Sequence, residues 1–167
     1  MLNYLYKFYL EVFYLKKLII FTLICVLLCG CGEKPVVNTK FENEINTFCT
    51  NISDIDAAIN DIDNITTDEA GLQAATSELL GYLDLLNDEF KKLAAIDFPT
   101  EYDYLENIAD QASDYMSEAV KSYHITYEEN YTESMENYAK ENYSRAYKRL
   151  QYILNTLNNT NTNSEEQ

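Results

Sequence analysis

This chain of 167 residues has no tryptophan, two prolines, four glycines and a single histidine. The low glycine and proline content argues against a β-rich architecture and against long loops. One histidine excludes zinc or iron sites that need several imidazoles. The chain also has no glycine-rich phosphate loop and no Gly-x-Ser-x-Gly motif. We therefore expect a protein that is not an enzyme and that uses no cofactor.

Basic residues are scarce beyond the first 30 positions. Residues 31–167 contain 27 Asp and Glu but only 9 Lys and Arg, which gives a formal charge of −18. The remaining acid and three lysines of the chain lie within residues 1–30. Nucleic acid is excluded as a partner, since its binding depends on Lys and Arg that contact phosphates. The charge also opposes docking flat on an anionic membrane leaflet, although this repulsion fades beyond about 8 Å at physiological salt.

Long apolar runs are missing as well. The longest, Leu18 to Leu28, has 11 residues, whereas a membrane-spanning helix needs about 20. The run follows Lys16-Lys17 and ends in the sequence Leu28-Cys29-Gly30-Cys31. A basic start, a short apolar core and a small residue before the cleavage point are the parts of a secretory signal.

The four residues Leu28, Cys29, Gly30 and Cys31 resemble a bacterial lipobox, the motif cut by signal peptidase II. The resemblance implies cleavage after Gly30 and a diacylglyceryl group, with acyl chains such as palmitate, on Cys31. It also implies a location on the extracytoplasmic face of the cell membrane, where two or more acyl chains hold a protein stably. The whole chain is similar to small lipoproteins of low-GC Gram-positive bacteria, a group with no established activity to transfer.

Two alternatives concern the first residues. Translation that begins at Leu15 on a non-standard codon would leave Leu15-Lys16-Lys17-Leu18 as an ordinary signal start. Alternatively, an uncleaved anchor would place its aromatic side chains at the membrane interface; these are Tyr4, Tyr6, Tyr9 and Tyr14.

Apolar residues in the remaining chain recur at intervals of three and four, which indicates amphipathic helices. The four stripes run over Phe41–Ile62, Leu72–Leu93, Leu105–Tyr123 and Ala139–Leu157. The breaks between them are short, so neighbouring helices should run antiparallel. We predict an all-α fold, an antiparallel up-down four-helix bundle. The alternative is a three-helix core with a loosely docked first helix.

The predicted organisation has four parts. Residues 1–30 form the signal peptide, 31–40 the lipidated cysteine with a short tether, 41–157 the helical bundle and 158–167 a disordered polar tail. Gly81 lies inside the second helix and is expected to allow a close helix crossing. Cys49 is the single free thiol of a mature chain whose Cys31 carries lipid, and we interpret it as a small buried residue.

Two groups of residues are candidates for a binding surface, and the first is a band of tyrosines around the turn between the third and fourth helices. Tyrosine combines a large apolar area with a polar tip, which suits saccharide or peptide, and packing is the alternative role. The tyrosines are Tyr123, Tyr127, Tyr131, Tyr138, Tyr143 and Tyr147. The second group is basic and comprises Lys140, Arg145, Lys148 and Arg149.

The basic group has two interpretations. If the last two helices fold back about residue 130, position 145 lies opposite 115 and position 149 opposite 111. Arg145 and Arg149 would then form ion pairs with Asp110 and Asp114. The alternative is a site for an anionic partner such as a wall polymer.

The remaining polar residues suggest no site. His124 is expected at the rim of the bundle. The acids of the first helix, Asp54, Asp56, Asp61 and Asp63, are expected to form its solvated face. A calcium loop that began at Asp61 would lack the required glycine and the bidentate glutamate.

These observations lead to one leading hypothesis. The chain would be a lipid-anchored, non-catalytic protein of the cell envelope that presents a helical bundle to a protein or a wall component. The alternative is a small-ligand or divalent-ion binding module that uses the bundle interior or the acids of the first helix.

Overall fold

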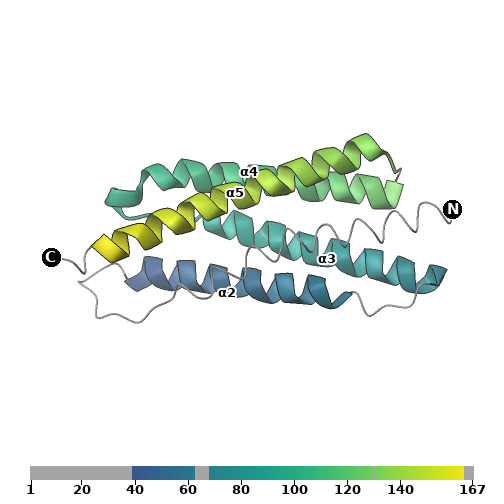
Figure 1. The fold of residues 1–167 in the computed structure, drawn as a ribbon, viewed down its shortest axis with the longest axis horizontal. Coiled ribbons are helices and arrows are strands. Elements are labelled where there is room, and N and C mark those ends of the chain that lie inside the picture. The colour runs from purple at the N-terminus through teal and green to yellow at the C-terminus, as the bar shows by residue number, and fades with distance from the viewer. Residues whose placement is uncertain (1–38, 63–67, 130, 164–167) are drawn as a thin grey trace.

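The computed structural model describes residues 39–62, 68–129 and 131–163. Its four long helices run in alternating directions along one axis (Figure 1), which confirms the predicted all-α, up-down four-helix bundle. They are α2 (Thr39–Asp61), α3 (Glu69–Ala94), α4 (Tyr104–His124) and α5 (Glu133–Asn163). No strand is present in these ranges.

The apolar stripes of all four helices meet in one core. Phe90 of α3 is fully buried and joins three helices: its ring contacts Phe48 of α2 at 5.9 Å and Tyr147 of α5 at 5.6 Å between centroids. The first helix also buries Ile52 and Ile59, so it is part of the core rather than loosely docked. Cys49 lies at the edge of this core and is half-buried.

The helix ends depend on short polar side chains. The Asp68 carboxylate accepts a hydrogen bond from the backbone N–H of Gly71 at 2.7 Å and caps α3. The hydroxyl of Thr132 does the same for α5, from the N–H of Met135 at 3.2 Å. Pro99 separates α3 from α4 as its missing N–H requires. A 3₁₀ turn, η3 (Thr100–Tyr102), follows it before α4 begins.

Two predictions about these helices are wrong. The first is disorder over residues 158–163 of the predicted tail, because α5 continues to Asn163; residues 164–167 lie outside the described residues. Once a helix is held by packed residues such as Leu157, each further residue adds one backbone hydrogen bond, and Asn and Thr are only moderately poor helix formers. The second is the close crossing at Gly81, because a Cβ atom built there meets no atom within 4 Å.

No helix within the ranges that the structure describes combines the length and the apolar character needed to cross a bilayer.

Gly81→Ala should stabilise the bundle. The position is exposed and helical and has room for a methyl group, so the substitution should raise the free energy of unfolding by about 1 kcal/mol. Urea denaturation measures this difference. Leu85→Ala, one turn further on the same helix and also exposed, is the control and should change it by less than about 0.5 kcal/mol. A loss of stability for Gly81→Ala would contradict this account.

Candidate functional site

The lipobox-like residues Leu28, Cys29, Gly30 and Cys31 lie outside the described residues, as do both alternatives for the first 30 positions. Lipidation therefore stays a prediction. The candidate residues within the bundle can be placed individually.

The tyrosine band does not form one surface. Tyr123 and Tyr143 are buried in the core, and Tyr127 stacks on Tyr123 with centroids 5.9 Å apart and rings 4° from parallel. Burial raises the pKa of both core tyrosines well above its ordinary value. Tyr138, in contrast, is 45% exposed. The buried members pack the bundle, and only the outward tyrosines remain available to a partner.

The inner tyrosines surround a buried carboxylate that the sequence analysis missed. Glu136 is 2% exposed; the Tyr131 hydroxyl donates a hydrogen bond to it at 2.6 Å, and Lys140 Nζ lies 3.2 Å away. Burial, together with the negative charge of Glu136, raises the pKa of Tyr127. The available signal was its position: Glu136 lies three residues before Ala139, on the extension of the apolar stripe.

A second buried acid corrects an earlier prediction. Asp56 is 5% exposed rather than solvated, and it accepts a hydrogen bond from the Tyr147 hydroxyl at 3.1 Å. Asp54 and Asp61 are exposed as expected, whereas Asp63 lies outside the described residues. The reason is again position, because Asp56 is four residues after Ile52 and shares its face of α2. This contact connects the first helix to the last.

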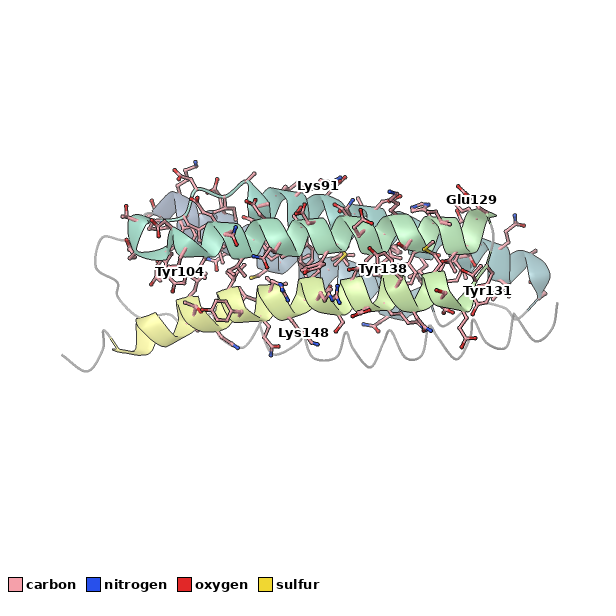
Figure 2. The ribbon with its side chains drawn as sticks, turned by 90° about the horizontal axis from the view of Figure 1, so that it is seen from above. Lys91, Tyr104, Glu129, Tyr131, Tyr138 and Lys148 are labelled. Carbon is pink, nitrogen blue, oxygen red and sulfur yellow. The ribbon has the colours of Figure 1, made fainter. Side chains whose placement is uncertain are left out.

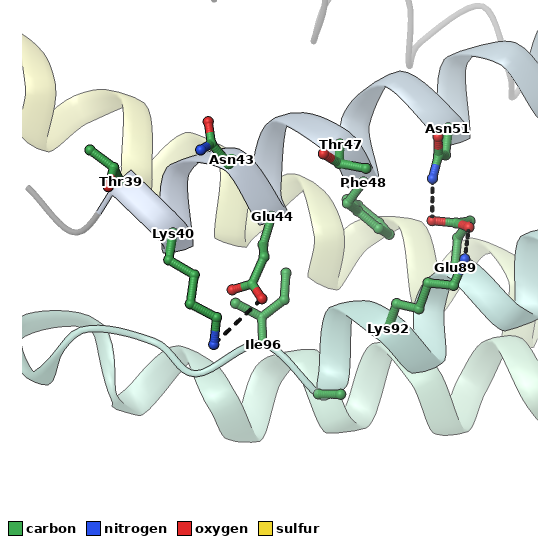
Figure 3. Close-up of a pocket in the computed structure, with 11 residues that line it drawn as sticks. Thr39, Lys40, Asn43, Glu44, Thr47, Phe48, Asn51, Glu89, Lys92 and Ile96 are labelled. Atoms are coloured by element: carbon green, nitrogen blue, oxygen red, sulfur yellow. Dashed lines mark hydrogen bonds and ion pairs between the residues drawn. The ribbon is translucent and has the colours of Figure 1, made fainter.

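A groove of about 680 Å³, lined by both polar and apolar side chains, runs between α2 and the end of α3 (Figure 3). Glu89 is buried at its floor, where it accepts a hydrogen bond from Asn51 at 3.0 Å and pairs with Lys92. Lys40 pairs with Glu44 at 3.7 Å on the other side. The charges of the groove therefore already have partners within the chain. These internal ion pairs reduce the attraction of the groove for a charged ligand.

Metal binding has no support in the described ranges. They contain no group of three or more His, Cys, Asp or Glu side chains placed to hold one ion.

His124 lies at the bundle rim, and it holds two elements together. Its Nδ1 atom is 2.8 Å from Glu128, in the π-helical turn η4 (Ile125–Glu129), and its Nε2 atom is 3.1 Å from Asp84 of α3. A neutral imidazole has one N–H, so both contacts are hydrogen bonds only when the ring is protonated. Burial alone would lower the pKa of His124, but the hydrogen bonds to Glu128 and Asp84 outweigh it and raise the pKa overall.

The basic residues of α5 have the predicted register but different partners. The guanidinium groups of Arg145 and Arg149 lie over the ring of Tyr115 at 5.5 and 4.8 Å from its centroid, and Arg149 donates a hydrogen bond to Gln111 at 3.4 Å. Arg145 pairs with Glu141 of its own helix. No ion pair joins these arginines to Asp110 or Asp114 among the described residues, so that prediction is wrong. The aromatic ring and the amide occupy the inner side of α4 instead.

The same two helices carry most of the exposed tyrosines. Tyr104 is 51% and Tyr152 is 53% exposed, and Figure 2 shows Tyr104 and Tyr138 along the seam between α4 and α5. From Asn142 to Asn163, α5 contains no acid and three bases. We refer to this surface as the α4–α5 face; its aromatic and basic residues are Tyr104, Tyr115, Tyr138, Arg145, Lys148, Arg149 and Tyr152, of which Tyr115, Arg145 and Arg149 are half-buried.

No family model, no curated protein and no solved structure matches this chain. The candidate site therefore depends on the chemistry of the α4–α5 face alone.

Tyr147→Phe tests the contact between the first and last helices. Removal of the hydroxyl takes a hydrogen bond from the buried Asp56 carboxylate, so the free energy of unfolding should fall by about 1.5–3 kcal/mol. Chemical denaturation measures the loss. Tyr82→Phe is the matched control, because its hydroxyl reaches the Glu78 carboxylate at 3.4 Å on the exposed side of α3. It should cost less than about 0.5 kcal/mol. Equal effects of the two substitutions would argue against a stabilising buried contact.

The His124 contacts should make stability depend on pH. Because the folded-state pKa of His124 is raised above 6.5, its contribution is fully present below pH 6.5 and is lost as the pH rises through the raised value. The comparison is the free energy of unfolding of the wild type and of His124→Gln, which keeps a polar side chain without titrating. The difference between them should shrink with rising pH; a difference that is constant, or that grows, would exclude this role.

Proposed function

We propose that this chain is a lipid-anchored, non-catalytic protein of the cell envelope that binds a protein or a wall component through its α4–α5 face. The observation that carries the proposal is the concentration of exposed tyrosines on this one face, beside the stretch of α5 from Asn142 to Asn163 that contains three bases and no acid.

The composition of the face is that of binding surfaces in general. Tyrosine and arginine are enriched where partners contribute most binding energy, because each offers a large contact area and directional hydrogen bonds. Tyr115 holds the guanidinium groups of Arg145 and Arg149 in place, so less side-chain entropy is lost when a partner binds. The formal charge of −18 is the total over residues 31–167 and does not describe this face.

The buried acids support a non-catalytic role. Asp56, Glu89 and Glu136 each accept a hydrogen bond from a neighbouring side chain. The single histidine is held between Asp84 and Glu128. These groups stabilise the bundle, and none of these contacts involves a serine, threonine or cysteine side chain.

The position of the first helix suits an anchor on Cys31. Thr39, where α2 begins, is eight residues after Cys31, a distance of at most about 28 Å when the chain is extended. This end of the bundle is opposite the turn between α4 and α5 (Figure 1). An anchor there would leave the α4–α5 face open to a partner.

A small-ligand module is the second candidate function, and the groove between α2 and α3 is the observation that favours it. Its internal ion pairs make it the weaker candidate. A divalent ion has less support still, because the described acids do not cluster. Calorimetric titration of calcium and zinc into the protein tests divalent-ion binding directly, and heat from specific binding would support this candidate function.

Cys31→Ser should abolish membrane attachment of the processed form. Cys31 is the residue that the lipobox resemblance assigns to acylation, so the variant should take up no labelled palmitate and its signal should remain uncleaved. Metabolic labelling and mass spectrometry of the amino terminus measure both. Cys29→Ser is the matched control, because it changes a neighbouring cysteine that leaves with the signal, and it should be labelled normally. An unmodified amino terminus in the wild type, or release of all the product into the medium, would refute the anchor.

A further inference from the structure

The α4–α5 face carries acids beside its bases. Asp110, Asp114 and Glu118 are exposed on α4 at intervals of four residues, so they form one row on that helix. Arg145 and Lys148 are on the outward side of α5, and Figure 2 shows Lys148 on its outer side. The exposed acids of this face are therefore mainly on α4 and its bases mainly on α5, apart from Glu141 of α5 and Lys121 of α4, and the two rows run side by side.

The two rows are level with each other along the bundle. Contacts of Arg145 with Tyr115 and of Arg149 with Gln111 give the register of the antiparallel pair. Asp114 is thus level with Arg145 and Lys148, and Asp110 is level with Arg149. Within one chain the arginines instead contact Tyr115, Gln111 and Glu141.

We propose that the partner of the α4–α5 face is a second copy of this chain, related by a two-fold axis that runs parallel to the helices along the seam between α4 and α5. This inference names the partner of the surface under Proposed function and rests on that proposal. The two identical faces pair directly.

Such an axis makes the face complementary to itself. A half-turn about it lays α4 of the second copy over α5 of the first without changing the height of any residue. Asp114 of the second copy then lies over Arg145, and Asp110 of the second copy lies near Lys148. The symmetry repeats both contacts on the other side of the axis. Glu118 comes near Glu141, and Lys121, one turn along, offsets that repulsion.

The exposed tyrosines lie where they would be covered. Tyr138 is on the seam (Figure 2) and would meet its own copy across the axis. Tyr152 is about level with Ile108 and would lie near Tyr104 of the second copy. These rings are about half exposed in the single chain, and aromatic pairs of this kind favour association beyond the area that they bury.

A two-fold axis parallel to the helices also suits the predicted lipid anchor on Cys31. Because it is parallel to the helices, both copies begin α2 at the same end of the dimer, so both anchors can enter one membrane. A two-fold axis across the helices would put the two Thr39 ends on opposite sides (Figure 1). The two-fold axis parallel to the helices therefore brings opposite charges together and also leaves both anchors at the same end of the dimer.

The area indicates weak pairing in solution and stronger pairing on a membrane. Two neighbouring helices about 20 Å wide and about 30 Å long offer about 600 Å² per copy, less than the roughly 800 Å² of a standard stable interface. Confinement to one membrane raises the effective concentration and offsets this deficit. Repulsion between the acidic remainders of the two copies is screened beyond about 8 Å. The contacts across the face are shorter than this distance, so they are screened less.

Cross-linking of the full chain in cells tests the pairing. In a Cys49→Ser background, Tyr138→Cys should give a covalent dimer with a short bismaleimide, because residue 138 lies near the axis. Leu85→Cys, which is exposed on α3, is the matched control and should give none. Addition of Arg145→Asp and Lys148→Asp should lower the cross-linked fraction at least about tenfold, since attraction becomes repulsion on both sides of the axis.

A charge exchange decides the identity of the partner. Adding Asp110→Arg and Asp114→Arg to the reversed variant should restore the dimer, because the two rows then attract again. A Tyr138→Cys signal no higher than that of Leu85→Cys would overturn the proposal. Loss on reversal without recovery on exchange would also overturn it, and would indicate an anionic polymer as the occupant. Fractionation of the same cells reports the anchor separately: a membrane-bound chain that does not cross-link refutes only the dimer, and a released chain refutes the anchor.

Discussion

The close packing of α4 against α5 is the interaction on which the other features of this molecule depend. It is the most extensive helix interface of the bundle. Small side chains line it, because Ala109, Ala112 and Ala119 of α4 and Ala139 and Ala146 of α5 are all fully buried. Alanines let two helices approach closely, and the space that they leave is filled by the rings of Tyr123 and Tyr143. The register that results places two arginines over one tyrosine ring and gives the α4–α5 face its composition.

Buried acids are the second feature of the architecture. A carboxylate without a partner in the core would cost several kcal/mol, and here Asp56, Glu89 and Glu136 each accept a hydrogen bond from a side chain. Two of these bonds join α2 to another helix, Asn51 with Glu89 and Tyr147 with Asp56. Directional contacts of this kind allow one arrangement of α2 on the bundle, whereas apolar packing alone tolerates small shifts. The polar contacts therefore help to define the position of the first helix.

Charge in this protein is informative at the scale of a face rather than of the chain. The total opposes anionic partners, yet the last two-thirds of α5 carries bases and no acid. Screening limits each charge to its near surroundings, so a partner that contacts the α4–α5 face responds to the local arrangement. The partners of a strongly acidic protein therefore depend on the arrangement of charges on its folded surface, because folding decides which charges share a face.

The sequence by itself determined the helices, their antiparallel order and even the level of residues 145 and 149 against 115 and 111. The reason is that helix periodicity and short connections are local properties, and two antiparallel helices joined by a tight turn have little freedom in register. Tertiary structure alone decided that Asp56, Glu89 and Glu136 are buried, that Tyr123 is in the core while Tyr138 is not, and that Arg145 and Arg149 contact Tyr115 and Gln111 instead of aspartates. Each of these outcomes depends on which side of a helix a neighbour covers, and that depends on side chains distant in the sequence.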